Sequence, residues 1–173
     1  MSYKDFNISE VAQKFDLTLV GDNRFLPEIK PVSPHPCLLK YLEESIPLAI
    51  AMGTGKARSE LIITPIIFEL RKLFNKEISF FSGEEFNVDE NLALTGVCDF
   101  IVSLSPEQLF IEAPVLIIIE AKKENLKDVL GQCIAQMVAA QKLNAKHDES
   151  LTIYGSITNG NIWNFLKLEE DIV

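Results

Sequence analysis

The sequence has few of the residues that usually cross-link a small protein or bind a transition metal. Its 173 residues include three cysteines, two histidines and one tryptophan. Cys37, Cys98 and Cys133 are odd in number, widely spaced and set among apolar neighbours. This pattern predicts reduced residues in a cytoplasmic protein rather than a disulfide or zinc framework. His35 and His147 have no partners at metal-ligand spacing, so a histidine metal centre is not expected.

Long apolar runs are also missing. The longest, at 46–52, 61–68 and 114–119, are too short to span a bilayer. The opening residues, MSYKDFN, lack the apolar stretch of a secretory signal. We therefore expect no membrane partner and a cytoplasmic location.

Positive charge is in short supply. The chain has 16 Lys and Arg against 25 Asp and Glu, a net charge of −9. Broad non-specific attraction to nucleic acid is not expected, because that attraction depends on neutralising phosphates. Local basic groups remain at Lys56 with Arg58, and at Lys122 with Lys123.

The composition, 47% hydrophobic and 24% charged, is that of an ordinary globular chain. We expect an N-terminal extension, residues 1–52, that packs on a core domain, residues 53–173. In the extension, Ser9 can cap a short helix that ends near Phe15. A second helix is expected over 36–44, with its leucines turned inward (Leu38, Leu39 and Leu42).

The strongest strand signal lies at 115–119, where five aliphatic residues follow one another and four of them are β-branched. Such a run predicts a strand buried on both faces in the middle of a sheet. It ends abruptly in Glu120-Ala121-Lys122. Because side chains alternate along a strand, Glu120 and Lys122 are expected on one face and Ala121 on the other.

Within residues 53–75, helical spacing predicts a helix after Gly53-Thr54-Gly55-Lys56, with a core stripe of Ile63, Ile66, Ile67, Leu70 and Phe74. Glu60 falls at the edge of that stripe. A second core helix is expected over 127–143, with Gln132 and Gln136 on one strip.

Further strands are expected at 77–81, before a turn or bulge at 82–85, and at 92–103, 151–157 and 162–168. In the strand at 92–103, Val97, Asp99 and Ile101 should share one face, and Cys98, Phe100 and Val102 the other. The order of elements predicts an α/β fold with a mixed sheet flanked by helices.

Four polar residues stand out at one expected end of the sheet: Glu60, Asp99, Glu120 and Lys122. Each alone has an ordinary interpretation, because Asp99 can cap a turn and Glu120 with Lys122 can form a surface ion pair. Together they supply up to three carboxylates and one lysine from adjacent elements. Such a cluster is typical of a functional site.

In this order of elements, the sequence resembles the PD-(D/E)XK nuclease superfamily, whose restriction-endonuclease-like core is αβββαβ. The resemblance is carried by Glu60, by Asp99 and by Glu120-Ala121-Lys122. More narrowly, the chain looks like the nuclease-type domain at the start of type I restriction motor subunits. That likeness includes Ile63-Thr64-Pro65-Ile66 and the closing stretch at 158–165, and it covers roughly 53–168.

The resemblance implies a DNA hydrolase that depends on Mg²⁺, or on Mn²⁺ in its place. Its catalytic residues would be Glu60, Asp99, Glu120 and Lys122. The cation would be held by the carboxylates of Asp99 and Glu120 and the carbonyl of Ala121. Candidate accessory residues are Gln132 and Gln136, and candidate DNA contacts are Lys56, Arg58 and Lys123.

A different class of function stays open. A nuclease fold without activity would be a binding or assembly module that acts with a partner protein. A partner for targeting and a homodimer are compatible with either alternative.

Overall fold

The computed structural model of the chain describes residues 1–21, 30–122 and 126–173. Its centre is a five-stranded sheet in the order β1-β2-β3-β4-β5. Neighbouring strands are antiparallel, except that β3 and β4 are parallel. The predicted α/β class with a mixed sheet is therefore confirmed. The strands are β1 (Ser79–Glu85), β2 (Val97–Ser103), β3 (Val115–Ala121), β4 (Ile153–Thr158) and β5 (Trp163–Leu168).

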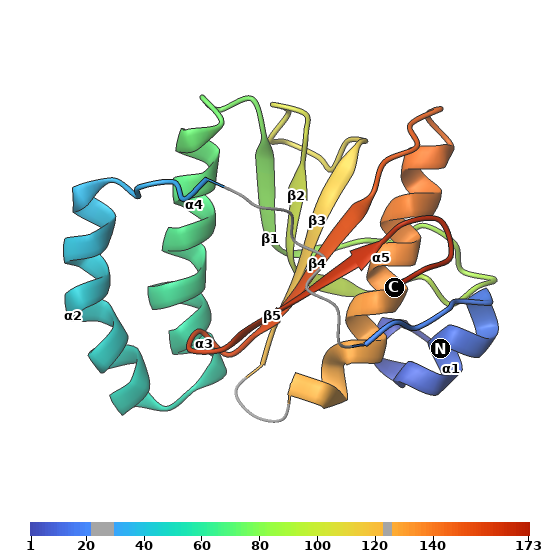
Figure 1. Cartoon of the computed structure of the whole chain (residues 1–173), viewed down its shortest axis with the longest axis horizontal. Helices are drawn as coiled ribbons and strands as arrows, with labels where there is room; N and C mark the ends of the chain where they lie inside the picture. Colours follow the sequence, from blue (N-terminus) through green and yellow to red (C-terminus); the bar gives the residue numbers. More distant parts are fainter. Residues whose placement is uncertain (22–29, 123–125) are drawn as a thin grey trace.

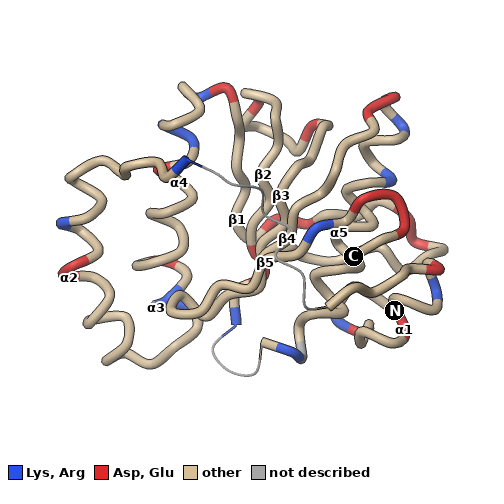
Figure 2. The backbone as a smooth tube through the Cα atoms, viewed as in Figure 1, with Lys and Arg blue, Asp and Glu red and all other residues tan. Residues whose placement is uncertain are grey.

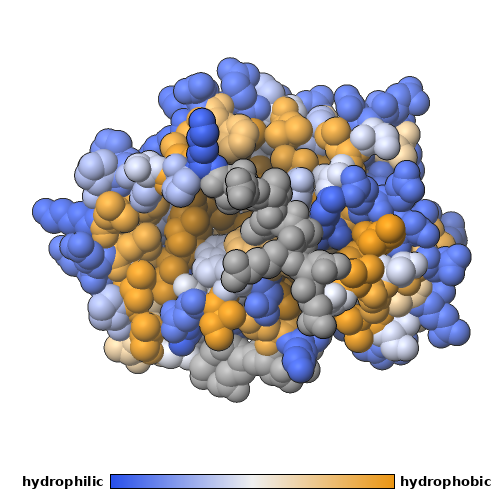
Figure 3. Space-filling model, in the orientation of Figure 1, coloured by the Kyte–Doolittle hydropathy of each residue, from blue (hydrophilic) through white to orange (hydrophobic). Residues whose placement is uncertain are grey.

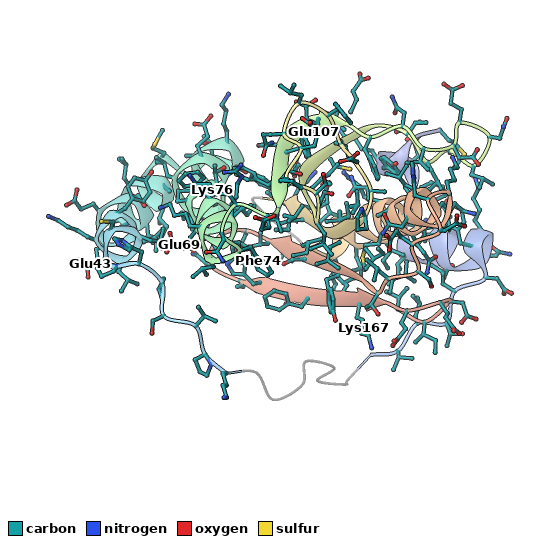
Figure 4. The ribbon with its side chains drawn as sticks, turned by 90° about the horizontal axis from the view of Figure 1, so that it is seen from above. Glu43, Glu69, Phe74, Lys76, Glu107 and Lys167 are labelled. Carbon is teal, nitrogen blue, oxygen red and sulfur yellow. The ribbon has the colours of Figure 1, made fainter. Side chains whose placement is uncertain are left out.

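Helices lie on both sides of the sheet (Figures 1 and 4). On one side, α5 (Leu130–Ala145) makes the crossover between the parallel strands β3 and β4, and α1 (Ile8–Phe15) packs against it. On the other side lies α4 (Thr64–Leu73), with α2 (Pro36–Met52) outside it (Figure 1). The two sides of the sheet therefore have separate hydrophobic clusters.

β3 is the central strand that its aliphatic run predicts. Ile118 belongs to the cluster on the α5 side, whereas Ile119 belongs to the cluster on the α4 side. Its ladder with β2 has its last pair at Phe100 and Ile119, but its ladder with β4 continues to Ala121 and Thr158. β2 and β3 thus part beyond Ile119, and we call this opening the strand fork.

β2 does not alternate as expected near the strand fork. Cys98 and Ile101 both belong to the α5-side cluster, whereas Phe100 and Val102 belong to the α4-side cluster. The prediction that Cys98 shares a face with Phe100 is therefore wrong. The strand changes its facing at Asp99, the residue at which it leaves β3.

β1 is longer than predicted, because the turn or bulge expected at 82–85 does not interrupt the strand. Ser82 and Glu84 pair with Phe100 and Cys98 in continuous register. Gly83 lies between them at a φ of 70°. Glycine adopts this left-handed conformation without a steric penalty, so the strand continues through it.

The helix predicted after Lys56 is divided in the structure, where the stretch consists of three segments: α3 (Gly55–Arg58), a π-helical turn (η2, Ser59–Ile63) and α4. Pro65 has no N–H for the carbonyl four residues earlier, that of Leu61. The Ser45 hydroxyl of α2 donates to this carbonyl at 2.8 Å. Because Pro65 cannot donate to the Leu61 carbonyl, this carbonyl is free to accept the hydrogen bond from Ser45, which links α2 to the η2–α4 helix.

α2 runs eight residues further than the predicted end at 44, through Pro47. Pro47 has no N–H to donate to the Glu43 carbonyl, four residues earlier. Glu43 is exposed, so its carbonyl can accept a hydrogen bond from water instead. The fully buried residues of α2 are the small Ser45 and Ala49. Leu39, predicted to face inward, is exposed, as is Phe74 just after α4. Figure 3 shows the apolar side chains that α2 presents at the surface.

The N-terminal segment is part of the core. A 3-10 turn (η1, Tyr3–Asp5) and α1 contribute Tyr3, Phe6 and Val11 to the α5-side cluster. Asn7 caps α1, and Glu10 returns a reciprocal bond, so the predicted cap at Ser9 is wrong. Gly131 of α5 lies so close that an added Cβ would overlap the Phe6–Asn7 backbone.

None of the helices in the described ranges combines the length and the apolar character that crossing a bilayer requires.

Candidate functional site

Asp99 and Glu120 lie across the strand fork from each other, one step beyond the Phe100–Ile119 pair. Each carboxylate accepts a backbone N–H from the opposite strand. The Asp99 N–H donates to Glu120 Oε1 at 3.3 Å, and the Ala121 N–H donates to Asp99 Oδ2 at 2.8 Å. Side chains thus replace the missing ladder bonds, and the two predicted acidic residues are brought together.

Two glutamines of α5 complete the surroundings of Glu120. Gln132 Nε2 donates to Glu120 Oε2 at 2.8 Å, and Gln136 Nε2 donates to Oε1 at 2.7 Å. Gln136 Nε2 also lies 3.4 Å from the carbonyl of Val97 on β2. The four-residue interval places both glutamines on one face of the helix. Glu120 therefore accepts hydrogen bonds from both amides and from the backbone.

Burial of Glu120, which is 3% exposed, is the main reason why its pKa rises from 4.5 to about 8. The neighbouring Asp99 carboxylate raises the pKa further, while hydrogen bonds from Gln136 and from the Asp99 backbone partly offset the rise. The site thus concentrates more negative charge than its buried surroundings readily hold.

Two thiols lie within electrostatic range of Glu120. Burial and the Glu120 charge raise the pKa of both Cys98 and Cys133, so both thiols stay neutral. The sequence did not predict that these thiols lie near Glu120. They are far apart in the chain, and the change of facing at Asp99 puts Cys98 on the α5 side of the sheet. The Val97 carbonyl, which lies 3.4 Å from Gln136 Nε2, could not be predicted either, because no side-chain pattern marks one backbone carbonyl among the others.

Lys122 lies one residue beyond β3 and is exposed. Its backbone N–H donates to the Thr158 carbonyl at 2.8 Å, which continues the pairing of β3 with β4 past the strand end. Ala121, between the two charged residues, is half-buried against the α4-side cluster. The Glu-x-Lys motif thus combines a buried carboxylate with an exposed lysine.

Glu60 is not part of the Asp99–Glu120 pair. It lies in the π-helical turn, its side chain is 61% exposed, and its carboxylate is 3.6 Å from Lys56 Nζ. No hydrogen bond or ion pair within the described ranges joins it to Asp99 or Glu120. A π turn holds one more residue than an α turn, which rotates the preceding residues by about 100° relative to α4. The predicted place of Glu60, at the edge of the stripe that contains Ile63 and Ile67, assumed a regular α-helix and was therefore wrong.

The predicted DNA contacts have different surroundings. Lys56 is exposed and pairs with Glu60. Arg58 is half-buried, and its Nη1 donates to the Asn159 carbonyl of the β4–β5 hairpin at 2.8 Å. Lys123 lies outside the described residues. Figure 2 shows basic positions in α3 and beside the end of β3, at the same end of the sheet.

The chemistry of the pair suits a hydrated hard cation. Within the described part of the chain, no three His, Cys, Asp or Glu side chains gather to hold a metal. Mg²⁺, however, commonly binds through one or two carboxylates and keeps several waters. Asp99 and Glu120 supply two such carboxylates, and a cation would offset the repulsion that raises the pKa of Glu120.

The fold and the pair define an α/β protein with a carboxylate site at the open end of a mixed sheet. Comparisons with protein-family models, curated proteins and solved structures find no match for the chain.

Proposed function

We propose that the chain is a divalent-metal-dependent nuclease with a restriction-endonuclease-like core, which hydrolyses DNA in the cytoplasm. The observation that carries the proposal is the Asp99–Glu120 pair at the strand fork, two residues before the exposed Lys122. The sequence of helices and strands around the pair supports the same assignment.

Asp99 and Glu120 would hold the cation through their carboxylates, and the Ala121 carbonyl would be a third oxygen ligand. A bound divalent cation supplies charge neutralisation at the phosphate and lowers the pKa of an attacking water. Lys122 donates hydrogen bonds to that water and to the phosphate oxygens, where negative charge grows in the transition state. Glu60, paired with Lys56, has no part in this first cation site.

DNA approaches along a narrow basic path in this proposal. Lys56 and Arg58 of α3 and Lys122 lie at the fork end of the sheet, with Lys123 next in sequence. Few phosphates are contacted, so affinity should be low and should fall only gently with salt. A chain with net charge −9 is therefore weak alone and is aided by a partner protein or by self-association.

A binding or assembly module is the second candidate. One observation favours it: both Glu120 oxygens already accept hydrogen bonds from protein donors. Through these hydrogen bonds, the Glu120 carboxylate can have a purely structural role, which is to hold α5 against the sheet.

Cleavage of single- and double-stranded DNA and RNA, with Mg²⁺ or Mn²⁺, tests the proposal. Lys122→Ala should abolish cleavage but keep cation binding, whereas Asp99→Ala should abolish both. Lys127→Ala is the control, because it removes another exposed lysine, five residues further along the chain. Equal residual cleavage by wild type and Asp99→Ala on every substrate would favour the binding module.

A further inference from the structure

Gln132 and Gln136 hold both oxygens of one carboxylate from a single helix. They are 7% and 0% exposed, and their amides donate to different oxygens of Glu120, at 2.8 and 2.7 Å. Two donors on one rigid helix prevent the carboxylate from turning about its terminal bond. The orientation of Glu120 is thus set before any ligand arrives.

Gln136 also ties the two strands at the place where their ladder has ended. Its Nε2 lies between Glu120 Oε1 of β3 and the Val97 carbonyl of β2, at 2.7 and 3.4 Å. Among the described residues, the amide of Gln132 donates a hydrogen bond to Glu120 of β3 and to no group on β2. Gln136 therefore limits how far Asp99 and Glu120 can separate, whereas Gln132 fixes only the orientation of Glu120.

Packing alone does not account for these glutamines. The other buried residues of α5 are mostly small or apolar, such as Ala135, Val138 and Ala139. Among the described residues, Gln136 Oε1 has no hydrogen-bond partner although it is buried. Burying an oxygen that has no hydrogen-bond donor is unfavourable. The Gln136 side chain is therefore oriented so that its NH₂ group donates at the strand fork, to Glu120 and to the Val97 carbonyl, while its oxygen stays unpaired.

We propose that Gln132 and Gln136 are positioning residues that fix Glu120 in the orientation that binds a divalent cation, with Gln136 also setting the width of the strand fork. This inference rests on the proposed function. Groups that orient a metal ligand in this way typically change metal affinity about 10- to 100-fold when they are lost.

Methionine substitutions test the inference, because methionine keeps the length of glutamine and removes its hydrogen bonds. Mn²⁺ affinity is measured by calorimetry on the full chain, with melting in EDTA as the check on folding. Gln132→Met should weaken Mn²⁺ binding about tenfold, and Gln136→Met should weaken it more. Gln141→Met is the matched control on the same helix, because that amide donates instead to the Glu170 carbonyl at 2.8 Å.

The outcomes separate this inference from the proposed function. If wild type binds Mn²⁺ and both fork variants bind it equally well, the inference is overturned and the nuclease proposal stands. If only the melting temperature falls, the glutamines are structural and the inference is also overturned. If wild type binds no Mn²⁺, the proposed function fails, and the inference fails with it. Should Gln136→Met not fold, the affinity of Gln132→Met decides, because it leaves the tie between the strands intact.

Discussion

Asp99 and Glu120 face each other at the strand fork, and each carboxylate is hydrogen-bonded to the other's strand. The relationship is costly, because two neighbouring carboxylates repel and one of them is almost fully buried. A cation between them would offset that cost.

Stability without cations should fall as pH rises from about 4.5 to 8. The pKa of Glu120 is about 8 in the folded chain and about 4.5 in the unfolded chain, so only the folded state binds this proton in that window. Each pH unit should then cost up to about 1.4 kcal/mol of unfolding free energy. Urea unfolding in EDTA measures the slope. Glu120→Gln should flatten it, whereas the exposed Glu84→Gln should keep it; equal slopes in all three proteins would contradict the prediction.

Mg²⁺ and Mn²⁺ should raise the melting temperature at neutral pH. A ligand at 100 times its Kd adds about 2.7 kcal/mol, which corresponds to roughly 5–10 °C for a chain of this size. Differential scanning fluorimetry at increasing cation concentration measures the shift. Asp99→Asn should remove it, and Ca²⁺ and high NaCl serve as controls for charge screening. A melting temperature indifferent to millimolar Mg²⁺ and Mn²⁺ would count against the site.

Gly131→Ala should destabilise the fold by about 1–3 kcal/mol. Alanine is the better helix former by up to about 1 kcal/mol, but its Cβ would overlap the backbone at Phe6 and Asn7. Gly21→Ala is the control, because an added Cβ there meets nothing within 4 Å. Chemical denaturation of both variants decides. A Gly131→Ala protein as stable as wild type would show that α1 does not pack this closely.

Ser45→Ala should cost about 1–3 kcal/mol, because it leaves the Leu61 carbonyl without its donor. The cost should shrink in a Pro65→Ala background, since residue 65 then has an N–H for that carbonyl. A double-mutant cycle in urea measures the coupling. Additive effects would show that Ser45 and Pro65 do not share the Leu61 carbonyl.

Local patterns predicted the sheet and the acidic pair well. The aliphatic run at 115–119 is buried on both faces, which fixed it as the central strand. Asp99 was assigned to a strand by its apolar neighbours, and Glu120 by the end of that run. Antiparallel pairing of two adjacent strands then suffices to bring them together.

The misses have tertiary or backbone causes. The π turn at Ser59–Ile63, close to Pro65, interrupts the helical period. Glu60 therefore does not lie at the edge of the apolar stripe where the sequence placed it. The predicted helix end at 44 was wrong, because α2 continues through Pro47, and the carbonyl that this proline leaves without a donor belongs to the exposed Glu43. The contacts of Gln132 and Gln136 with Glu120 depend on how α5 crosses the sheet, which no local pattern reports.

Anomalous diffraction from crystals soaked in Mn²⁺ tests the central claim most directly. The account predicts a strong peak at the strand fork, within bonding distance of carboxylate oxygens of both Asp99 and Glu120, and no such peak in Asp99→Asn crystals. Mn²⁺ found only elsewhere on the molecule, with Glu120 still hydrogen-bonded to Gln132, Gln136 and the Asp99 N–H, would contradict it.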